Sequence, residues 1–177
     1  NMGDRENEIL DKFITERGLK PVVAINTHGH FDHLLGVNHL VERYGVKFAL
    51  ARKDEFLLKT ASVSAELFGV RAGDLPETID IDLDSEKKIK FGQTELEIIS
   101  TPGHTPGSVC FIMGSDCITG DTLFRGSIGR TDLPGGDGAT MRRTLERLSE
   151  WTDNVRIYPG HGDPSDMAYE KKYNPYL

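Results

Sequence analysis

The stretch Thr27-His28-Gly29-His30-Phe31-Asp32-His33 places three histidines and an aspartate in one short segment. In an extended turn, His28 and His30 point to the same side, so one cation can bind both imidazoles. Asp32 and His33 follow where an apolar helical period begins, so they project from the first helical turn toward a second cation. The segment therefore predicts two metal half-sites that share one loop.

Three later segments, each containing glycine, supply the remaining candidate ligands. They are Pro102-Gly103-His104-Thr105, Gly120-Asp121-Thr122 and Pro159-Gly160-His161-Gly162. Of the six histidines in the chain, five lie in these clusters, and with two aspartates they form a ligand set for two transition metals. The sixth, His39, falls within a helix predicted from Asp32 to about Tyr44, where we expect a structural role.

Each cluster also follows a short, apolar, β-branched run, which is typical of a buried strand that ends at a turn. These runs cover residues 22–26, 96–100, 109–113 with 116–119, and 155–158. Four strands are thus expected to deliver their ligands to one edge of a sheet, which is where α/β proteins place ligand sites.

The rest of the chain predicts helices and one further strand pair. Helices are expected over 6–17, closing at Gly18, over 53–68, from Thr140 as an N-cap through Trp151, and from Ser165 to the residue before Asn174. The alternating segment 74–93 predicts a half-exposed strand pair with its turn near residues 85–86. The segment 125–138, rich in glycine and aspartate, predicts an ordered loop beside the site.

Composition restricts the class of protein. With 177 residues, of which 37% are hydrophobic, the chain fits one domain with a sizeable core. A formal net charge of -7 without a basic run argues against nucleic acid and anionic membranes as partners. No signal peptide or long apolar run is visible, so a cytoplasmic location is expected. Cys110 and Cys117 cannot form a disulfide framework and are expected to be buried as small apolar residues.

The order of the motifs resembles the metallo-β-lactamase-fold superfamily. A His-x-His-x-Asp-His segment at residues 28–33 is followed by Gly-His, Gly-Asp and Gly-His segments in that order. Within the superfamily, Thr101-Pro-Gly-His-Thr-Pro-Gly-Ser108 and the segment 120–132 are similar to glyoxalase II-like hydrolases of the short, single-domain type. The resemblance implies an α/β fold, namely a four-layer αββα sandwich, in one metallo-hydrolase domain over residues 1–177.

The resemblance also implies roles for the candidate ligands. His28, His30 and His104 would hold one metal, whereas Asp32, His33 and His161 would hold the other. Asp121 would bridge the two. True β-lactamases of this fold usually lack the bridging acid, so Asp121 argues for another substrate class. The ligand types suit zinc, iron or manganese, and we favour two zinc ions.

The activity implied is hydrolysis of a small-molecule thioester such as a hydroxyacyl-glutathione. A hydroxide that bridges the two divalent metals would attack the carbonyl, and Asp32 would orient it. Arg125 and Arg130 are candidates for contacting an anionic thioester. Pairing of Arg130 with Asp132 or Asp137 is the structural alternative, which we place slightly ahead.

Two other functions stay open. A mononuclear iron persulfide dioxygenase resembles the segment 120–131 and would use His28, His104 and Asp121 as a facial triad. A non-catalytic metal-binding module is the second alternative. The segment Pro159-Gly-His-Gly162 looks more like the hydrolases, which favours hydrolysis.

The start of the chain departs from the family pattern. Members open with several β-strands before an Asp-Pro-Gly-type turn, and here that turn corresponds at best to residues 1–4. We therefore expect a domain that lacks the opening N-terminal strands. Its sheet would have an exposed edge and face unless a homo-oligomer or another chain completes it.

Overall fold

Strand β2 (Lys47–Leu50) shows how the chain is layered, because it is buried on both faces. In the computed structural model, which describes residues 4–177, Phe48 and Leu50 pack toward helices on one side. Ala49, between them, belongs to a cluster with Phe111 of a second sheet. Because successive side chains of a strand point to opposite faces, this strand lies between a helical layer and another sheet.

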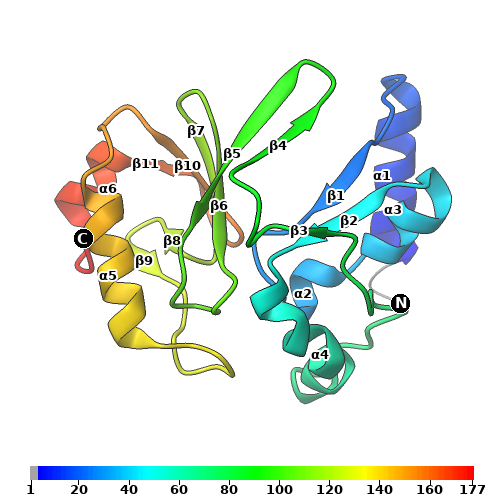
Figure 1. Cartoon of the computed structure of the whole chain (residues 1–177), viewed down its shortest axis with the longest axis horizontal. Helices are drawn as coiled ribbons and strands as arrows, with labels where there is room; N and C mark the ends of the chain where they lie inside the picture. The colour runs from blue at the N-terminus through cyan, green and yellow to red at the C-terminus, as the bar shows by residue number, and fades with distance from the viewer. Residues whose placement is uncertain (1–3) are drawn as a thin grey trace.

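The strands form two main sheets (Figure 1). The first is parallel, with the order β1-β2-β3, where β1 is Val23–Ile25 and β3 is Ile81–Asp82. The second has the order β11-β10-β7-β6-β5-β4. Its strands are β4 (Lys88–Phe91), β5 (Thr94–Ser100), β6 (Val109–Met113), β7 (Asp116–Gly120), β10 (Arg156–Pro159) and β11 (Ser165–Asp166). A small separate ribbon pairs β8 (Leu123–Phe124) with β9 (Ser127–Ile128).

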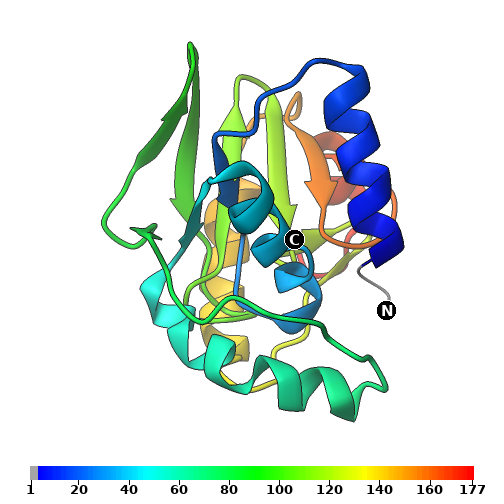
Figure 2. The same cartoon turned by 90° about the vertical axis from the view of Figure 1, so that its right-hand side faces the viewer.

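Helices cover the outer side of each sheet (Figure 1). On the side of the first sheet lie α1 (Asp4–Glu16), α2 (Phe31–Leu34), α3 (Val37–Tyr44) and α4 (Glu55–Leu67), the last preceded by the 3-10 turn η1 (Arg52–Asp54). On the side of the second sheet lie α5 (Gly138–Ser149) and α6 (Met167–Tyr173). The layers therefore run helix, sheet, sheet, helix, as the expected four-layer sandwich requires. The β4–β5 hairpin projects beyond the neighbouring strands in both views (Figure 1, Figure 2).

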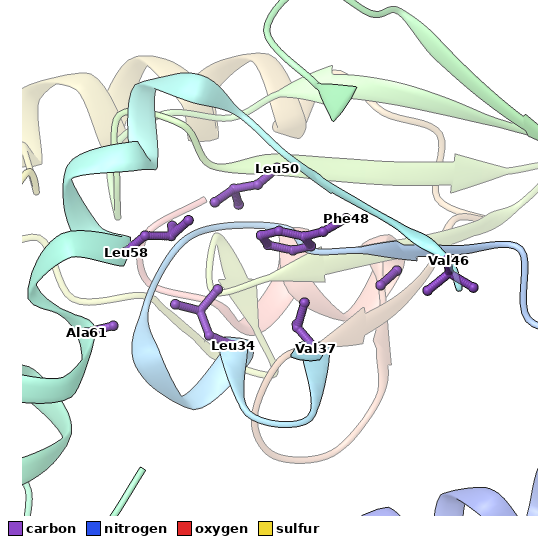
Figure 3. Close-up of a cluster of buried hydrophobic side chains, with 8 residues drawn as sticks. Leu34, Val37, Val46, Phe48, Leu50, Leu58 and Ala61 are labelled. Atoms are coloured by element: carbon purple, nitrogen blue, oxygen red, sulfur yellow. The ribbon is translucent and has the colours of Figure 1, made fainter. Parts of the chain in front are cut away.

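Three apolar clusters fill the spaces between the layers. The first lies between the first sheet and its helices, and includes Leu34, Val37, Phe48 and Leu58 (Figure 3). The second, between the two sheets, contains Ala49, Ala51, Leu83, Ile89, Leu96, Ile98, Val109 and Phe111. The third joins Cys110, Cys117 and Ile157 of the second sheet to Met141, Leu145 and Leu148 of α5. Both cysteines are 0% exposed, so their predicted burial is confirmed.

The strand pair predicted for residues 74–93 is wrong. β3 pairs in parallel with β2, whereas β4 pairs antiparallel with β5, so the two strands belong to different sheets. Alternation marks a half-buried strand but does not name its partner. Leu83 and Ile89 both point into the cluster between the sheets, which explains why the alternation continues while the chain crosses from one sheet to the other.

Three of the predicted helices also need correction. The helix predicted from Asp32 to Tyr44 is divided into α2 and α3, because Gly36 adopts a φ of 81°, in the left-handed region that favours glycine. The N-cap predicted at Thr140 is wrong: α5 begins earlier, and Asp137 Oδ1 accepts a hydrogen bond from the Thr140 backbone N–H at 2.6 Å. Residues 165–166 form β11, and α6 starts at Met167. The helices predicted over 6–17 and 53–68 are confirmed as α1 and α4.

Part of the second sheet is exposed on the face that carries Phe111. Ile118 is the cross-strand partner of both Phe111 and Tyr158, so the three side chains share this face. Phe111 is 2% exposed, whereas Ile118 is 46% and Tyr158 is 38% exposed. An exposed apolar sheet surface was expected, and it is present at these two residues.

The turn predicted at residues 1–4 lies mostly outside the described residues. Within residues 4–177, no helix has the length and apolar character needed to cross a bilayer.

Candidate metal centre

All candidate ligands predicted from the sequence lie together at the ends of strands from both sheets. The set comprises His28 and His30 after β1, Asp32 and His33 on α2, His104 after β5, Asp121 after β7, and His161 after β10. β5, β7 and β10 run in the same direction, so their carboxyl ends meet at one edge of the second sheet. The expectation of a single sheet edge is therefore wrong for β1, which belongs to the first sheet.

His28, His30 and His104 form the first ligand group. One nitrogen from each lies within 4.8 Å of the others. His30 Nδ1 and His104 Nε2 are 2.8 Å apart. The His28 ring centroid is 4.9 Å from that of His30 and 4.8 Å from that of His104. Three imidazoles that converge in this way offer the protein ligands of one open tetrahedral site.

Asp32, His33 and His161 form the second ligand group, again with one ligand atom each within 4.8 Å of the others. His161 Nε2 is 3.0 Å from Asp32 Oδ2, and His33 Nε2 is 3.7 Å from the same oxygen. Asp32 and His33 therefore project from the first turn of α2 toward a second ligand group, as predicted. His33 also adjoins the first group, because its ring centroid is 4.1 Å from that of His28, and His28, His33 and Asp121 form a further group of possible ligands.

Asp121 lies between the two groups. Its Oδ1 is 3.3 Å from His33 Nε2. Its Oδ2 is 3.6 Å from His104 Nε2 and 3.6 Å from His161 Nε2. One carboxylate thus reaches nitrogens of both groups, which is the arrangement that a bridging ligand requires.

The cluster is also rich in buried polar atoms without a partner. Among the described residues, five buried side-chain atoms lack a hydrogen-bond partner, and four of them are His28 Nε2, His30 Nε2, His33 Nε2 and Asp121 Oδ1. Each unpaired buried polar atom costs about 1–3 kcal/mol. Cations bound here would satisfy these atoms, and imidazole and carboxylate donors without thiolate suit zinc, iron or manganese. The residues present therefore fit divalent metal ions.

Neighbouring groups hold the imidazoles in the orientation that coordination needs. His104 Nδ1–H donates to the backbone carbonyl of Arg130 at 2.7 Å, which leaves the Nε2 lone pair facing the cluster. In the tautomer that binds metal through Nε2, His28 Nδ1–H donates to Thr27 Oγ1 at 3.1 Å. Asn26 Nδ2 donates to the backbone carbonyl of His33 at 2.6 Å and so fixes the end of α2.

Burial disfavours the charged form of two imidazoles in the first group, His28 and His30. Burial lowers the pKa of His28 well below its ordinary value of 6.5, and His33 and His104 lower it further. Burial lowers the pKa of His30 to about 4, with a further contribution from His104. Neutral imidazole is the form that coordinates metal. Burial raises the pKa of Asp121, but the neighbouring His33, together with His104 and His161, outweighs this effect and leaves the pKa of Asp121 below its ordinary value of 3.8.

A cavity of about 310 Å³ opens on the cluster. Five candidate ligands line it, namely His30, Asp32, His104, Asp121 and His161. Its other walls are mostly apolar and consist of Phe31, Leu57, Phe68, Phe124, Ile128, Leu133 and Pro134, with Ser64 and Arg130 as the polar members. The segment 125–138 supplies four of these residues, so its predicted place beside the site is confirmed. It is not loop throughout, because Ser127–Ile128 form β9 and Gly138 begins α5.

The two candidate substrate arginines are placed differently. Arg130 lines the cavity, and its guanidinium donates to Asp132 at 2.9 and 2.7 Å, which is the structural pairing foreseen for it. Arg125 is not among the residues that line the cavity. Its guanidinium donates to the Pro164 carbonyl at 3.2 Å and lies 4.3 Å from the centre of the Tyr169 ring.

His39 lies away from the cluster, in agreement with the structural role expected for it. Its Nε2 is 2.9 Å from Asp11 Oδ1, which joins α3 to α1. Arg43 and Tyr44 contact the same carboxylate at 2.8 and 2.6 Å.

Sequence reasoning missed Asp54, a fully buried carboxylate next to the ligand loops. Its Oδ2 accepts hydrogen bonds from the Gly29 N–H at 2.9 Å and the Thr105 hydroxyl at 2.7 Å. Its Oδ1 accepts from the Gly107 N–H at 2.7 Å. In the sequence Arg52-Lys53-Asp54-Glu55, this residue looks like one more charged residue at a helix start, so no local signal distinguishes it.

Comparisons with known proteins give a consistent result. The model of the metallo-beta-lactamase superfamily matches residues 4–161. Hydroxyacylglutathione hydrolase GloC of Haemophilus influenzae is 37% identical over 179 residues, which cover 97% of this chain and 83% of that protein. The crystal structure of TTHA1623 in a di-iron-bound form is 33% identical, with a TM-score of 0.87 over 99% of this chain and 86% of the other. The crystal structure of BLEG-1 B3 metallo-beta-lactamase is 29% identical, with a TM-score of 0.88 over 97% and 84% of the two chains.

Proposed function

The chain belongs to the metallo-β-lactamase superfamily, and we propose that it is a two-metal thioester hydrolase that acts on a small acyl thioester such as a hydroxyacyl-glutathione. Membership of this superfamily and the cluster of histidine and aspartate side chains that could hold metal ions support a metal-dependent hydrolase. The two-metal stoichiometry, the individual ligand roles and the thioester substrate are the proposal.

The observation that carries the proposal is the position of Asp121 between two ligand groups. His28, His30 and His104 would hold one cation, Asp32, His33 and His161 the other, and Asp121 both. Two bound cations would supply a hydroxide nucleophile at neutral pH and a Lewis acid for the carbonyl oxygen. A di-iron form of a relative with 33% identity supports a paired site of this kind.

The residues that line the cavity favour a substrate whose leaving group departs easily. Apart from the candidate ligands, the described residues that line it include no lysine, tyrosine, cysteine or carboxylic acid. An amine leaving group needs a proton from such an acid, whereas a thiol has a pKa of about 8.5 and leaves as thiolate without strong acid help. The cavity is therefore better suited to a thioester than to an amide.

Asp32 is the carboxylate that we assign to the attacking water. It lines the cavity, and its side chain is part-exposed, so one oxygen can accept a hydrogen bond from water while the other contacts His161. This holds the water beside the second ligand group and directs it toward the cavity. Asp32 thus positions the nucleophile as well as serving as a candidate ligand.

The walls of the cavity suggest how the substrate is held. Phe68, Phe124 and Leu133 offer apolar surface to the carbon skeleton and exclude bulk water from the carbonyl. Arg130 is the only lysine or arginine among the described residues that line the cavity. Its guanidinium would pair with a carboxylate of the thiol portion, in exchange for its exposed contact with Asp132.

The test is anaerobic turnover of S-lactoylglutathione by the metal-loaded protein, followed as release of free thiol. We expect hydrolysis without oxygen, abolished by a chelator, and little or no cleavage of the corresponding amide or of a β-lactam. Turnover that needs oxygen and a persulfide would assign the dioxygenase activity instead. Faster opening of a β-lactam would assign a lactamase, and metal binding without any turnover would leave a binding module.

A further inference from the structure

Asp54 is a charged side chain buried at the junction of the two sheets. Among the described residues, it and Glu170 are the carboxylates with 0% exposure. A carboxylate buried to this degree is costly unless donors satisfy it. Asp54 is satisfied by three donors, and all three lie in the two loops that carry the first ligand group.

The three donors tie together segments that are distant in sequence. Gly29 lies between His28 and His30, in the loop that follows β1 of the first sheet. Thr105 and Gly107 lie directly after His104, in the loop that follows β5 of the second sheet. One carboxylate therefore links the loop that contains His28 and His30 to the loop that contains His104.

Both loops approach Asp54 closely, and at Gly107 the approach leaves no room for a side chain. A Cβ atom built on Gly29 would lie 3.0 Å from Asp54 Cβ, and one built on Gly107 would lie 2.7 Å from Asp54 Cγ and Oδ1. The contact at Gly107 is shorter than real Cβ atoms show, whereas the contact at Gly29 is tight and would require Asp54 to shift by a few tenths of an ångström. The close approach of Asp54 thus accounts for the presence of glycine at both positions, independently of the metal ligands.

We propose that Asp54 is a positioning residue that fixes the spacing of the His28–His30 pair relative to His104, so that the first metal finds its three imidazoles already arranged. The inference rests on the proposed metal-binding function. Asp54 does not itself contact substrate or metal; it acts through the backbone of Gly29 and the turn at residues 105–107. Partners that orient ligands in this way contribute about 10–100-fold to metal affinity.

The test compares Asp54→Asn with Glu170→Gln in the full chain. Glu170 is a matched control, since it is equally buried and also accepts three hydrogen bonds, from the Ser165 hydroxyl, the Gly126 N–H at 2.9 Å and Asn174 Nδ2 at 2.8 Å. None of these donors adjoins a candidate ligand of the first group. In both variants an amide group, which donates hydrogen bonds, replaces one carboxylate oxygen that accepts hydrogen bonds in the wild-type protein.

The zinc affinity of each metal-free protein is measured by competition with a chromophoric chelator, well below the unfolding temperature. The stability of each protein is measured separately by urea unfolding. Both variants should lose stability, but only Asp54→Asn should bind zinc at the first ligand group about 10–100-fold more weakly. The role assigned to Asp54 would be overturned if Asp54→Asn bound zinc as tightly as the wild-type protein. It would also be overturned if Glu170→Gln lost as much zinc affinity as Asp54→Asn.

If Asp54→Asn does not fold, Thr105→Val removes a single donor while keeping the shape of the side chain. Zinc affinity should fall in Thr105→Val and recover in Thr105→Ser, which restores the hydroxyl; unchanged affinity in Thr105→Val would overturn the proposal. A wild-type protein that binds no zinc contradicts the proposed function. A wild-type protein that binds zinc, with no effect of these variants, contradicts only the role of Asp54.

Discussion

Asp121 is the candidate ligand whose two oxygens face both groups of imidazoles, so its removal should affect both metals. In Asp121→Ala, two cations would face each other with less negative charge between them, a repulsion that a low-dielectric site magnifies. We expect both metals to bind more weakly and thioester turnover to fall by at least about tenfold. Metal titration and thioester kinetics on the same preparation provide the measurement.

His39→Ala is the matched control for Asp121→Ala. It removes an imidazole that contacts Asp11 instead of the cluster. A partly exposed pair of this kind contributes less than about 1 kcal/mol, so His39→Ala should keep both metals and near-normal turnover. If Asp121→Ala retains two tightly held metals, the bridging assignment is wrong.

At the scale of single residues, the sequence predicts which candidate ligands come together but not which other residues hold them in place. Five candidate ligands follow a strand, and Asp32 and His33 lie on the short helix after β1, so the place of each can be inferred from the local pattern. Asp54 cannot be found in this way. Its partners lie 25, 51 and 53 residues away, and such contacts exist only once two sheets have packed.

At the scale of single elements, the start of α5 offers a test between two candidate N-cap residues, Asp137 and Thr140. Asp137 accepts a hydrogen bond from the Thr140 backbone, which every residue at position 140 except proline would still donate. Asp137→Ala should therefore cost about 1 kcal/mol of unfolding free energy. Thr140→Ala should cost less, because alanine has the higher helix propensity. Urea unfolding decides between them, and a larger loss in Thr140→Ala would restore the original assignment.

Element existence follows from periodicity more securely than element boundaries or partners do. The apolar periods of α1 and α4 locate both helices correctly. α4 buries a continuous face, whereas in α1 Ile14 is buried but Ile9 and Phe13 are 60% and 44% exposed. The period from residue 32 to 44 also looks continuous, yet Gly36 interrupts it by adopting a left-handed conformation that the apolar pattern does not reveal. Strands β3 and β4 alternate as predicted, but their partners depend on which sheet each joins.

At the scale of the whole molecule, the packing between the sheets holds the ligand loops at their spacing. Phe111 fills this interface at 2% exposure, whereas its cross-strand partner Ile118, on the same face, is 46% exposed. Phe111→Ala should cost about 3–5 kcal/mol. Ile118→Ala should cost clearly less, since it already contacts water. Similar losses in urea unfolding of the two variants would show that the sheets are not packed as described.

The four layers and the family could both be anticipated from the sequence, because four separated motifs agree in order and spacing. The distribution of the ligands over two sheets could not be anticipated, since the strand before His28 reads like the strands before His104, Asp121 and His161. The candidate centre therefore joins the two sheets, and metal ions bound there would stabilise the whole sandwich.

Metal stoichiometry tests the central claim most directly. Elemental analysis of protein purified without chelator should give close to two metal ions per chain, because seven ligands in two groups exceed what one cation uses. The value should fall toward one in His161→Ala, which removes a ligand of the second group only. A single metal ion per chain, unchanged in His33→Ala and His161→Ala, would contradict the two-metal account and favour a mononuclear centre at the first ligand group.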